Sequence, residues 1–147
     1  MPKIGSGNGT QLARGAWMSH PIHTPIADLV IGCAIEVHRM LGPGLLESTY
    51  ERCVAFELAE RGVEFELQFA LPVVYKGRKL DCGYRADLLI GRDLILEIKC
   101  VERLLPIHSA QAMTYLKLSG VSQVLLINFN VEILKDGIKS FLRPRST

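Results

Sequence analysis

A pair of almost continuously apolar segments most constrains how this chain can fold. Within residues 84–100, two apolar runs flank the tripeptide Gly91-Arg92-Asp93. Such runs are typical of strands that are buried on both faces of a sheet. The tripeptide between them is a short turn signal, and it predicts a β-hairpin in which Ile90 pairs with Leu94.

Three ionisable residues interrupt these apolar strands. Counting outward from the turn places Asp87 directly opposite Glu97, with their Cβ atoms about 5 Å apart. Lys99 lies two residues beyond Glu97 and therefore points to the same face. Two carboxylates at this distance repel each other, so the pair favours a bound cation. An acid pair and an amine on one face form the pattern of a metal-dependent phosphodiester-cleaving site. A surface ion pair is the simpler alternative, and the hairpin alone leaves it open.

Length and composition indicate a globular protein. The chain has 147 residues, of which 48% are hydrophobic and 22% are charged, and this is enough for one domain with its own core. We expect a flexible N-terminal leader over residues 1–22 and one domain over residues 23–147. No apolar run approaches the roughly 20 residues of a membrane span, and the N-terminus lacks a secretory-signal pattern. We therefore expect a cytoplasmic protein with no membrane partner.

Charge and cysteine usage narrow the function classes further. The net charge is only +2, but residues 76–147 carry 12 basic and 7 acidic groups, and they include the acid pair. This bias could help to hold a phosphate backbone, although a mixed solvated surface gives the same count. The four cysteines form no Cys-x-x-Cys pair, which disfavours a zinc ribbon or a thioredoxin-type motif. Reduced thiols are expected in the cytoplasm.

Helical and strand patterns follow one another along the chain. Thr24-Pro25, a capping residue followed by proline, predicts the start of a helix whose buried stripe includes Met40. Leu46 is expected in the buried stripe of a second helix, and residues 79–83 are expected to lead directly into the acid-pair hairpin. We expect helices over about residues 25–40, 45–61 and 106–118, and strands over about 63–69, 71–75, 84–90, 94–100, 121–129 and 138–142. This order predicts an α/β fold with a central mixed β-sheet flanked by helices.

Two further groups of residues could join the acid pair. His108, Gln111 and Tyr115 share one face of the third predicted helix. Gln111 and Tyr115 could orient a phosphate or a water, or they could form the polar edge of a packing helix, while His108 is more typical of a helix start. Glu47 lies in the first turn of the second helix, where the helix dipole alone favours a carboxylate. It could also complete an oxygen-rich Mg²⁺ or Mn²⁺ site.

These motifs together resemble a known family. The chain resembles the family named for its GxxExxY motif, a branch of the PD-(D/E)xK nuclease-like superfamily, over about residues 25–143. Ala86 replaces the proline that gives the superfamily motif its first letter, at a position that varies among its members. The residues that carry the resemblance are Gly44, Glu47 and Tyr50, then Tyr84-Arg85-Ala86-Asp87, Glu97-Ile98-Lys99, Gln111 with Tyr115, residues 127–130 and residues 135–137.

The resemblance implies a restriction-endonuclease-like core and a set of residue roles. It implies that Asp87 and Glu97 bind the metal and that Lys99 positions or activates the attacking water. It also implies that Glu47 and Gln111 assist. The spacing of Gln111 and Tyr115 is similar to the Gln-x-x-x-Tyr helix of RecB-like exonucleases.

The sequence therefore predicts a Mg²⁺- or Mn²⁺-dependent nuclease, with DNA favoured over RNA as its substrate. Lys99, Glu97, Asp87, Gln111 and Tyr115 are its expected catalytic residues. The expected metal ligands are the side chains of Asp87, Glu97 and Glu47 and the carbonyl of Ile98. Two alternatives stay open: a non-catalytic nucleic-acid-binding or assembly module that keeps the fold, and a purely structural ion-pair cluster. The chain's small size and apolar edges are also compatible with a homodimer.

Overall fold

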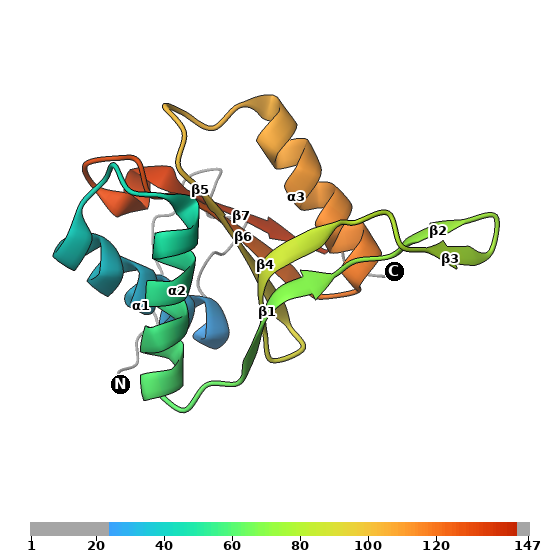
Figure 1. Ribbon diagram of the computed structural model, residues 1–147, viewed down its shortest axis with the longest axis horizontal. Helices are drawn as coiled ribbons and strands as arrows, with labels where there is room; N and C mark the ends of the chain where they lie inside the picture. Colours follow the sequence, from blue (N-terminus) through green and yellow to red (C-terminus); the bar gives the residue numbers. More distant parts are fainter. Residues whose placement is uncertain (1–23, 144–147) are drawn as a thin grey trace.

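A five-stranded mixed sheet with helices on both faces forms the body of the molecule (Figure 1). The structure, a computed structural model, describes residues 24–143, and the leader predicted over residues 1–22 lies outside them. The strand order is β1-β4-β5-β6-β7, and only β5 and β6 are parallel. The strands are β1 (Phe65–Ala70), β4 (Arg85–Ile90), β5 (Leu94–Lys99), β6 (Gln123–Asn128) and β7 (Ile138–Leu142).

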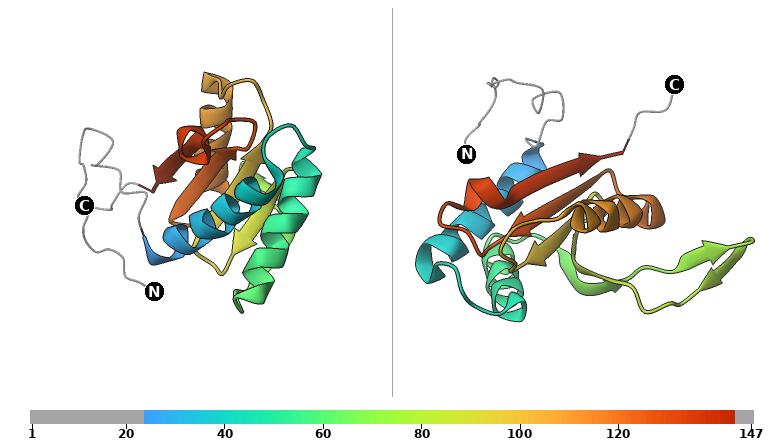
Figure 2. Two further views of the ribbon diagram at one scale, coloured as in Figure 1. Left: turned by 90° about the vertical axis from the view of Figure 1, so that its left-hand side faces the viewer. Right: turned by 90° about the horizontal axis from the view of Figure 1, so that it is seen from above.

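Two helices cover one face of this sheet and a third covers the other (Figures 1 and 2). α1 (Pro25–Leu41) and α2 (Glu47–Glu60) lie together on one face, and α3 (Pro106–Ser119) connects the parallel strands β5 and β6 across the other. α1 begins as predicted, because the Thr24 hydroxyl accepts a hydrogen bond from the Ala27 N–H at 3.1 Å and Pro25 needs no partner in the first turn. No helix among the described residues is long and apolar enough to cross a membrane.

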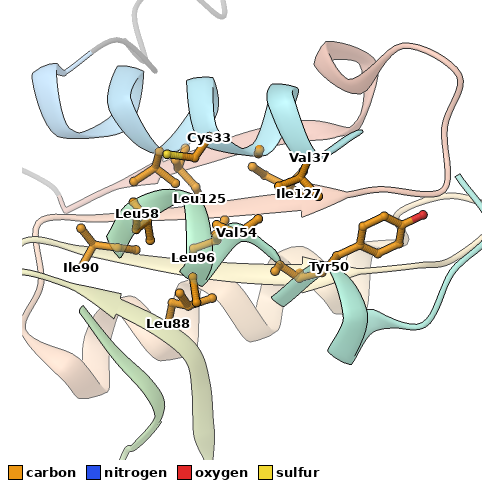
Figure 3. Close-up of a cluster of buried hydrophobic side chains, with 14 of the residues drawn as sticks. Cys33, Val37, Tyr50, Val54, Leu58, Leu88, Ile90, Leu96, Leu125 and Ile127 are labelled. Carbon is orange, nitrogen blue, oxygen red and sulfur yellow. The ribbon is translucent and has the colours of Figure 1, made fainter. Parts of the chain in front are cut away.

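The larger part of the core lies between the helix pair and the sheet (Figure 3). Aliphatic side chains from α1, α2, β4, β5 and β6 meet there, among them Val37, Val54, Leu58, Leu88, Leu96, Leu125 and Ile127. Each such burial stabilises the fold by about 1.5–3 kcal/mol relative to an exposed side chain. The core therefore fixes the central strands on which the acid pair is carried.

Two predictions about buried stripes are wrong. Leu46 is 72% exposed, because it is the extended capping residue before α2 and does not lie within the helix. Met40 is 65% exposed and lines a pocket between α1 and α2 instead of facing the sheet. The second helix accordingly begins at Glu47, two residues later than expected.

A separate two-stranded sheet extends from the body between β1 and β4 (Figure 1). β2 (Val73–Tyr75) pairs with β3 (Arg78–Leu80), and the segment 79–83 therefore does not simply lead into the next hairpin as predicted. Lys76 and Gly77 both have left-handed backbones, with φ of 50° and 79°. Two such residues make the tight turn whose twist matches that of antiparallel strands. Between β6 and β7 lies a short 3₁₀ helix, η3 (Leu134–Gly137).

Candidate active site

The acid pair lies at the point where the main-chain pairing between β4 and β5 ends and hydrogen bonds from the main chain to side chains begin. The predicted register is confirmed as far as the pair Leu88–Leu96. Beyond it, the Ile98 N–H donates to Asp87 Oδ2 at 2.8 Å, and the Asp87 N–H donates to Glu97 Oε1 at 3.3 Å. Each carboxylate thus accepts a main-chain hydrogen bond from the opposite strand. These bonds hold the two acids next to each other.

Glu97 is a buried acid next to a second carboxylate. The residue is only 4% exposed. Burial, with the neighbouring charge of Asp87 and against the opposing charge of Lys99, raises its pKa to about 9. No ion pair found among residues 24–143 includes any of these three residues. A solvent-exposed ion pair therefore does not describe the cluster, and without a cation the acid pair keeps a proton at neutral pH.

α3 joins two of the predicted residues to each other, and one of them, Tyr115, lies within the electrostatic reach of the acid pair. The Gln111 side-chain amide donates to the Tyr115 hydroxyl at 3.3 Å, and Tyr115 is almost fully buried. Burial, together with the charges of Glu97 and Asp87, raises the pKa of Tyr115 to about 12. The hydroxyl is therefore a neutral donor at physiological pH, next to the carboxylates.

His108 has the helix-start role that its position suggested. Its Nδ1 accepts the Leu105 N–H at 2.9 Å, across the first turn of α3. This bond satisfies a main-chain donor that the helix itself leaves without a partner. Because Nδ1 already accepts this hydrogen bond within the helix start, His108 has a structural role, and it was not among the predicted site residues.

Glu47 ties the start of α2 to the exit of β5. Its Oε2 accepts the Cys100 N–H at 3.0 Å, one residue beyond Lys99. The loop before Glu47 is held by Tyr50, whose hydroxyl donates to the Gly42 carbonyl at 2.5 Å and accepts the Leu45 N–H at 3.2 Å. Tyr50 therefore holds the loop that leads into α2, directly before Glu47.

Two residues that the sequence analysis missed contact the site. Gln68 has a left-handed backbone with φ of 51°, and its side-chain amide donates to Glu51 Oε1 at 2.9 Å and reaches Asp87 Oδ1 at 3.4 Å. Burial raises the pKa of Glu51, and the charge of Asp87 contributes. Glu51 lies four residues after Glu47, so both carboxylates lie on one face of α2. That spacing was a signal available in the sequence, whereas the unusual backbone of Gln68 was not.

Asn128 fixes the chain immediately after Lys99. It is 2% exposed, its Oδ1 accepts the Val101 N–H at 3.1 Å, and its Nδ2 donates to the Val101 carbonyl at 2.9 Å. Gly137 packs against it so closely that an added Cβ would lie 2.3 Å from the Asn128 carbonyl oxygen. The conformation of the β5 exit therefore depends on a buried amide at the end of β6.

The donor atoms at the acid pair are those that a hard divalent cation prefers. Asp87 and Glu97 supply carboxylate oxygens, and the predicted main-chain ligand, Ile98, lies between Glu97 and Lys99. Oxygen ligands favour Mg²⁺ and Mn²⁺, and a cation would replace the proton that the buried pair otherwise needs. Among the described residues, no three His, Cys, Asp or Glu side chains are placed to hold a metal together. Glu47 as a further ligand stays a prediction.

Comparison with known proteins places the chain in a family. The PD-(D/E)XK nuclease superfamily matches residues 24–141. Among solved structures, the chain is similar to an alkaline exonuclease (LHK-Exo) from Laribacter hongkongensis, with 16% identity and a TM-score of 0.46 over 84% of this chain and 73% of the exonuclease. No protein of curated function matches it. The superfamily match and the mixed sheet flanked by helices confirm the predicted restriction-endonuclease-like α/β fold, while assignment to the GxxExxY branch stays a prediction.

Proposed function

Because the chain belongs to the PD-(D/E)XK nuclease superfamily, we propose that it is a metal-dependent nuclease that hydrolyses phosphodiester bonds of DNA. The superfamily implies a nucleic-acid substrate and, in general, a divalent metal. The observation that carries the proposal is the buried acid pair, in which Glu97 is 4% exposed and accepts a hydrogen bond from Asp87. A buried pair of acids is costly unless a proton or a cation neutralises it.

The proposed cofactor is Mg²⁺ or Mn²⁺. Asp87, Glu97 and the Ile98 carbonyl would hold it, with Glu47 close by on α2. When bound, the cation would supply Lewis-acid polarisation of a phosphoryl oxygen and would make a nucleophile available at neutral pH. The hydrogen bonds from Ile98 and Asp87 to the carboxylates would keep the ligands in place, because oriented ligands bind a metal more tightly than mobile ones.

The remaining residues would act on the phosphate. The Lys99 ammonium is close enough to Glu97 to influence its pKa, and it would stabilise the negative charge that develops on the phosphoryl oxygens. Tyr115 keeps its proton at physiological pH and would donate a hydrogen bond to a phosphate oxygen. Gln111 would orient that hydroxyl through the bond between their side chains. Lys99, Gln111 and Tyr115 thus serve as donors around the reacting group.

A binding module without catalysis is the second candidate function. It is favoured by one observation, the lack of a third carboxylate in metal-binding geometry among the described residues. Such a module would bind DNA in a salt-sensitive way and release no product.

Cleavage of labelled DNA by Lys99→Ala tests the proposal. We expect the wild type to cut DNA with Mg²⁺ or Mn²⁺ and not with EDTA, and Lys99→Ala to lose activity by roughly 100- to 1000-fold, as for the loss of a donor to developing charge. Lys139→Ala, an exposed lysine on β7, is the matched control and should cut like the wild type. If Lys99→Ala cuts as fast as that control, the assigned role of Lys99 is wrong, and binding without cleavage by the wild type would favour the second candidate.

A further inference from the structure

The hairpin of β2 and β3, residues 72–83, stands away from the rest of the protein, and we call it the arm. Both figures of the whole molecule show it extending from the side opposite α1 (Figures 1 and 2). It forms a sheet of its own, with Val73 opposite Leu80 and Tyr75 opposite Arg78. An isolated two-stranded hairpin is marginally stable in water. The protein therefore maintains a projecting element that contributes little to its own core.

The surface of the arm combines apolar and basic side chains. Every residue from 74 to 85 is exposed, including Val74 and Tyr75, each at 59%. Residues 72–83 contain three basic groups, Lys76, Arg78 and Lys79, and one acidic group, Asp81. The Lys76 ammonium lies 5.5 Å from the centre of the Tyr75 ring. Exposed aromatic and aliphatic groups among positive charges match the chemistry of a nucleic acid, which presents sugars and bases between phosphates.

The base of the arm lies next to the candidate active site. The Leu71 N–H donates to the Tyr84 carbonyl at 2.9 Å and closes the arm at its base. The Tyr84 ring meets the Tyr115 ring edge-on, with 6.4 Å between their centres, and Asp87 follows three residues later. The base of the arm is therefore joined directly to β4, the strand that carries Asp87.

Building on the proposed nuclease function, we propose that the arm grips double-stranded DNA beside the scissile phosphate. The major groove of B-form DNA admits a two-stranded β-ribbon, and a ribbon with Lys76, Arg78 and Lys79 would also neutralise phosphates at its edges. The major groove of A-form RNA is deep and narrow and excludes such a ribbon. The arm thus makes duplex DNA the substrate class and discriminates against duplex RNA.

Charge removal on the arm tests this inference by binding, measured in EDTA so that no product forms. The arm variant carries Lys76→Gln, Arg78→Gln and Lys79→Gln. Its matched control removes three exposed charges elsewhere, by Arg39→Gln, Arg92→Gln and Lys135→Gln. The affinity for a labelled DNA duplex is measured across a salt series, with duplex RNA of the same sequence as competitor. Circular dichroism confirms that both variants are folded.

We expect the arm variant, but not the control variant, to bind DNA about 100-fold more weakly than the wild type near 0.1 M salt. Its plot of log K against log salt concentration should be less steep by about 2 to 3. It should also bind duplex DNA and duplex RNA about equally. Equal affinity and slope in the arm and control variants would overturn the inference. The inference would also be overturned if the arm substitutions dissociated a dimer into monomers without weakening DNA binding, because the arm would then contact a second copy of the chain. Wild-type cleavage reports separately on the nuclease assignment. If DNA binding depends on the arm but the wild type does not cleave, the proposed role of the arm is supported and the nuclease assignment is wrong. If the wild type cleaves but binding does not depend on the arm, the nuclease assignment is supported and the proposed role of the arm is wrong.

Discussion

Replacing Glu97 with glutamine should change how the stability of the metal-free protein depends on pH. Glu97 is 4% exposed, and its pKa is raised from 4.5 to about 9, first by burial and then by the charge of Asp87. Between these two values the folded protein holds a proton that the unfolded chain does not. The stability that this proton contributes is complete below the unfolded pKa and is lost as the pH rises through the folded pKa.

The size of the effect follows from one proton. Each pH unit in this window lowers the free energy of unfolding by about 1.4 kcal/mol, so the wild type should lose about 3 kcal/mol between about pH 6 and about pH 8. Glutamine resembles the protonated acid in shape and does not titrate. Glu97→Gln should therefore match the wild type in stability only below the unfolded pKa of 4.5, and its advantage should grow by about 3 kcal/mol between about pH 6 and about pH 8, apart from effects common to both proteins.

Urea unfolding in EDTA at several pH values measures this difference directly. Saturating Mn²⁺ should then stabilise the wild type more than Glu97→Gln, because the cation replaces the proton on the pair. Parallel stability curves for the two proteins in EDTA would refute the reasoning, because they would mean that Glu97 titrates with an ordinary pKa.

Three further changes test the supporting residues. Asn128→Ala leaves the Val101 N–H without its side-chain partner and the Val101 carbonyl with only the longer contact from Asn130 Nδ2 at 3.5 Å. It should lower the unfolding free energy by about 2–4 kcal/mol in urea titrations; an unchanged midpoint would contradict this. Tyr50→Phe removes the hydroxyl that bridges the loop before α2, so we expect a loss of about 1–2 kcal/mol in the same assay. Glu51→Gln alters the carboxylate linked through a glutamine to the acid pair, and calorimetry should show roughly 10-fold weaker Mn²⁺ binding. Glu60→Gln, at the exposed end of α2, is its control and should bind Mn²⁺ like the wild type.

The acid-pair hairpin could be predicted because the short turn between its strands fixes their register. The apolar pattern alone does not fix it, since both strands are apolar on both faces. Counting residues outward along both strands from the short turn at Gly91 places Asp87 and Glu97 opposite each other. The pairing of Ile90 with Leu94 is as predicted, and the carboxylates meet as a consequence.

The arm could be predicted only in part. A strand was expected over about residues 71–75, but β3 has only three residues, and both alternating and irregular patterns fit such a length. The turn uses Lys76 with a left-handed backbone, a conformation in which asparagine or glycine is the usual signal. The structure places Val73–Tyr75 on a projecting ribbon and not in the five-stranded sheet.

The hydrogen-bonded link from Glu51 through Gln68 to Asp87 could not be predicted, because it depends on contacts between residues that are distant in the sequence. Glu51 looked like an ordinary polar residue on the outer side of α2. Only the kink at Gln68, where φ is 51°, brings its amide to both carboxylates. Local propensity does not encode such a kink, so residue spacing alone could suggest Glu51 but not its partner.

The most direct test of a metal site at the acid pair is the rate of metal-dependent DNA cleavage by the wild type and by Asp87→Ala, purified identically. We expect cleavage by the wild type in Mg²⁺ or Mn²⁺, none in EDTA, and loss of cleavage in Asp87→Ala. Equal cleavage by the two proteins, or cleavage that persists in EDTA, would contradict a metal site at the acid pair.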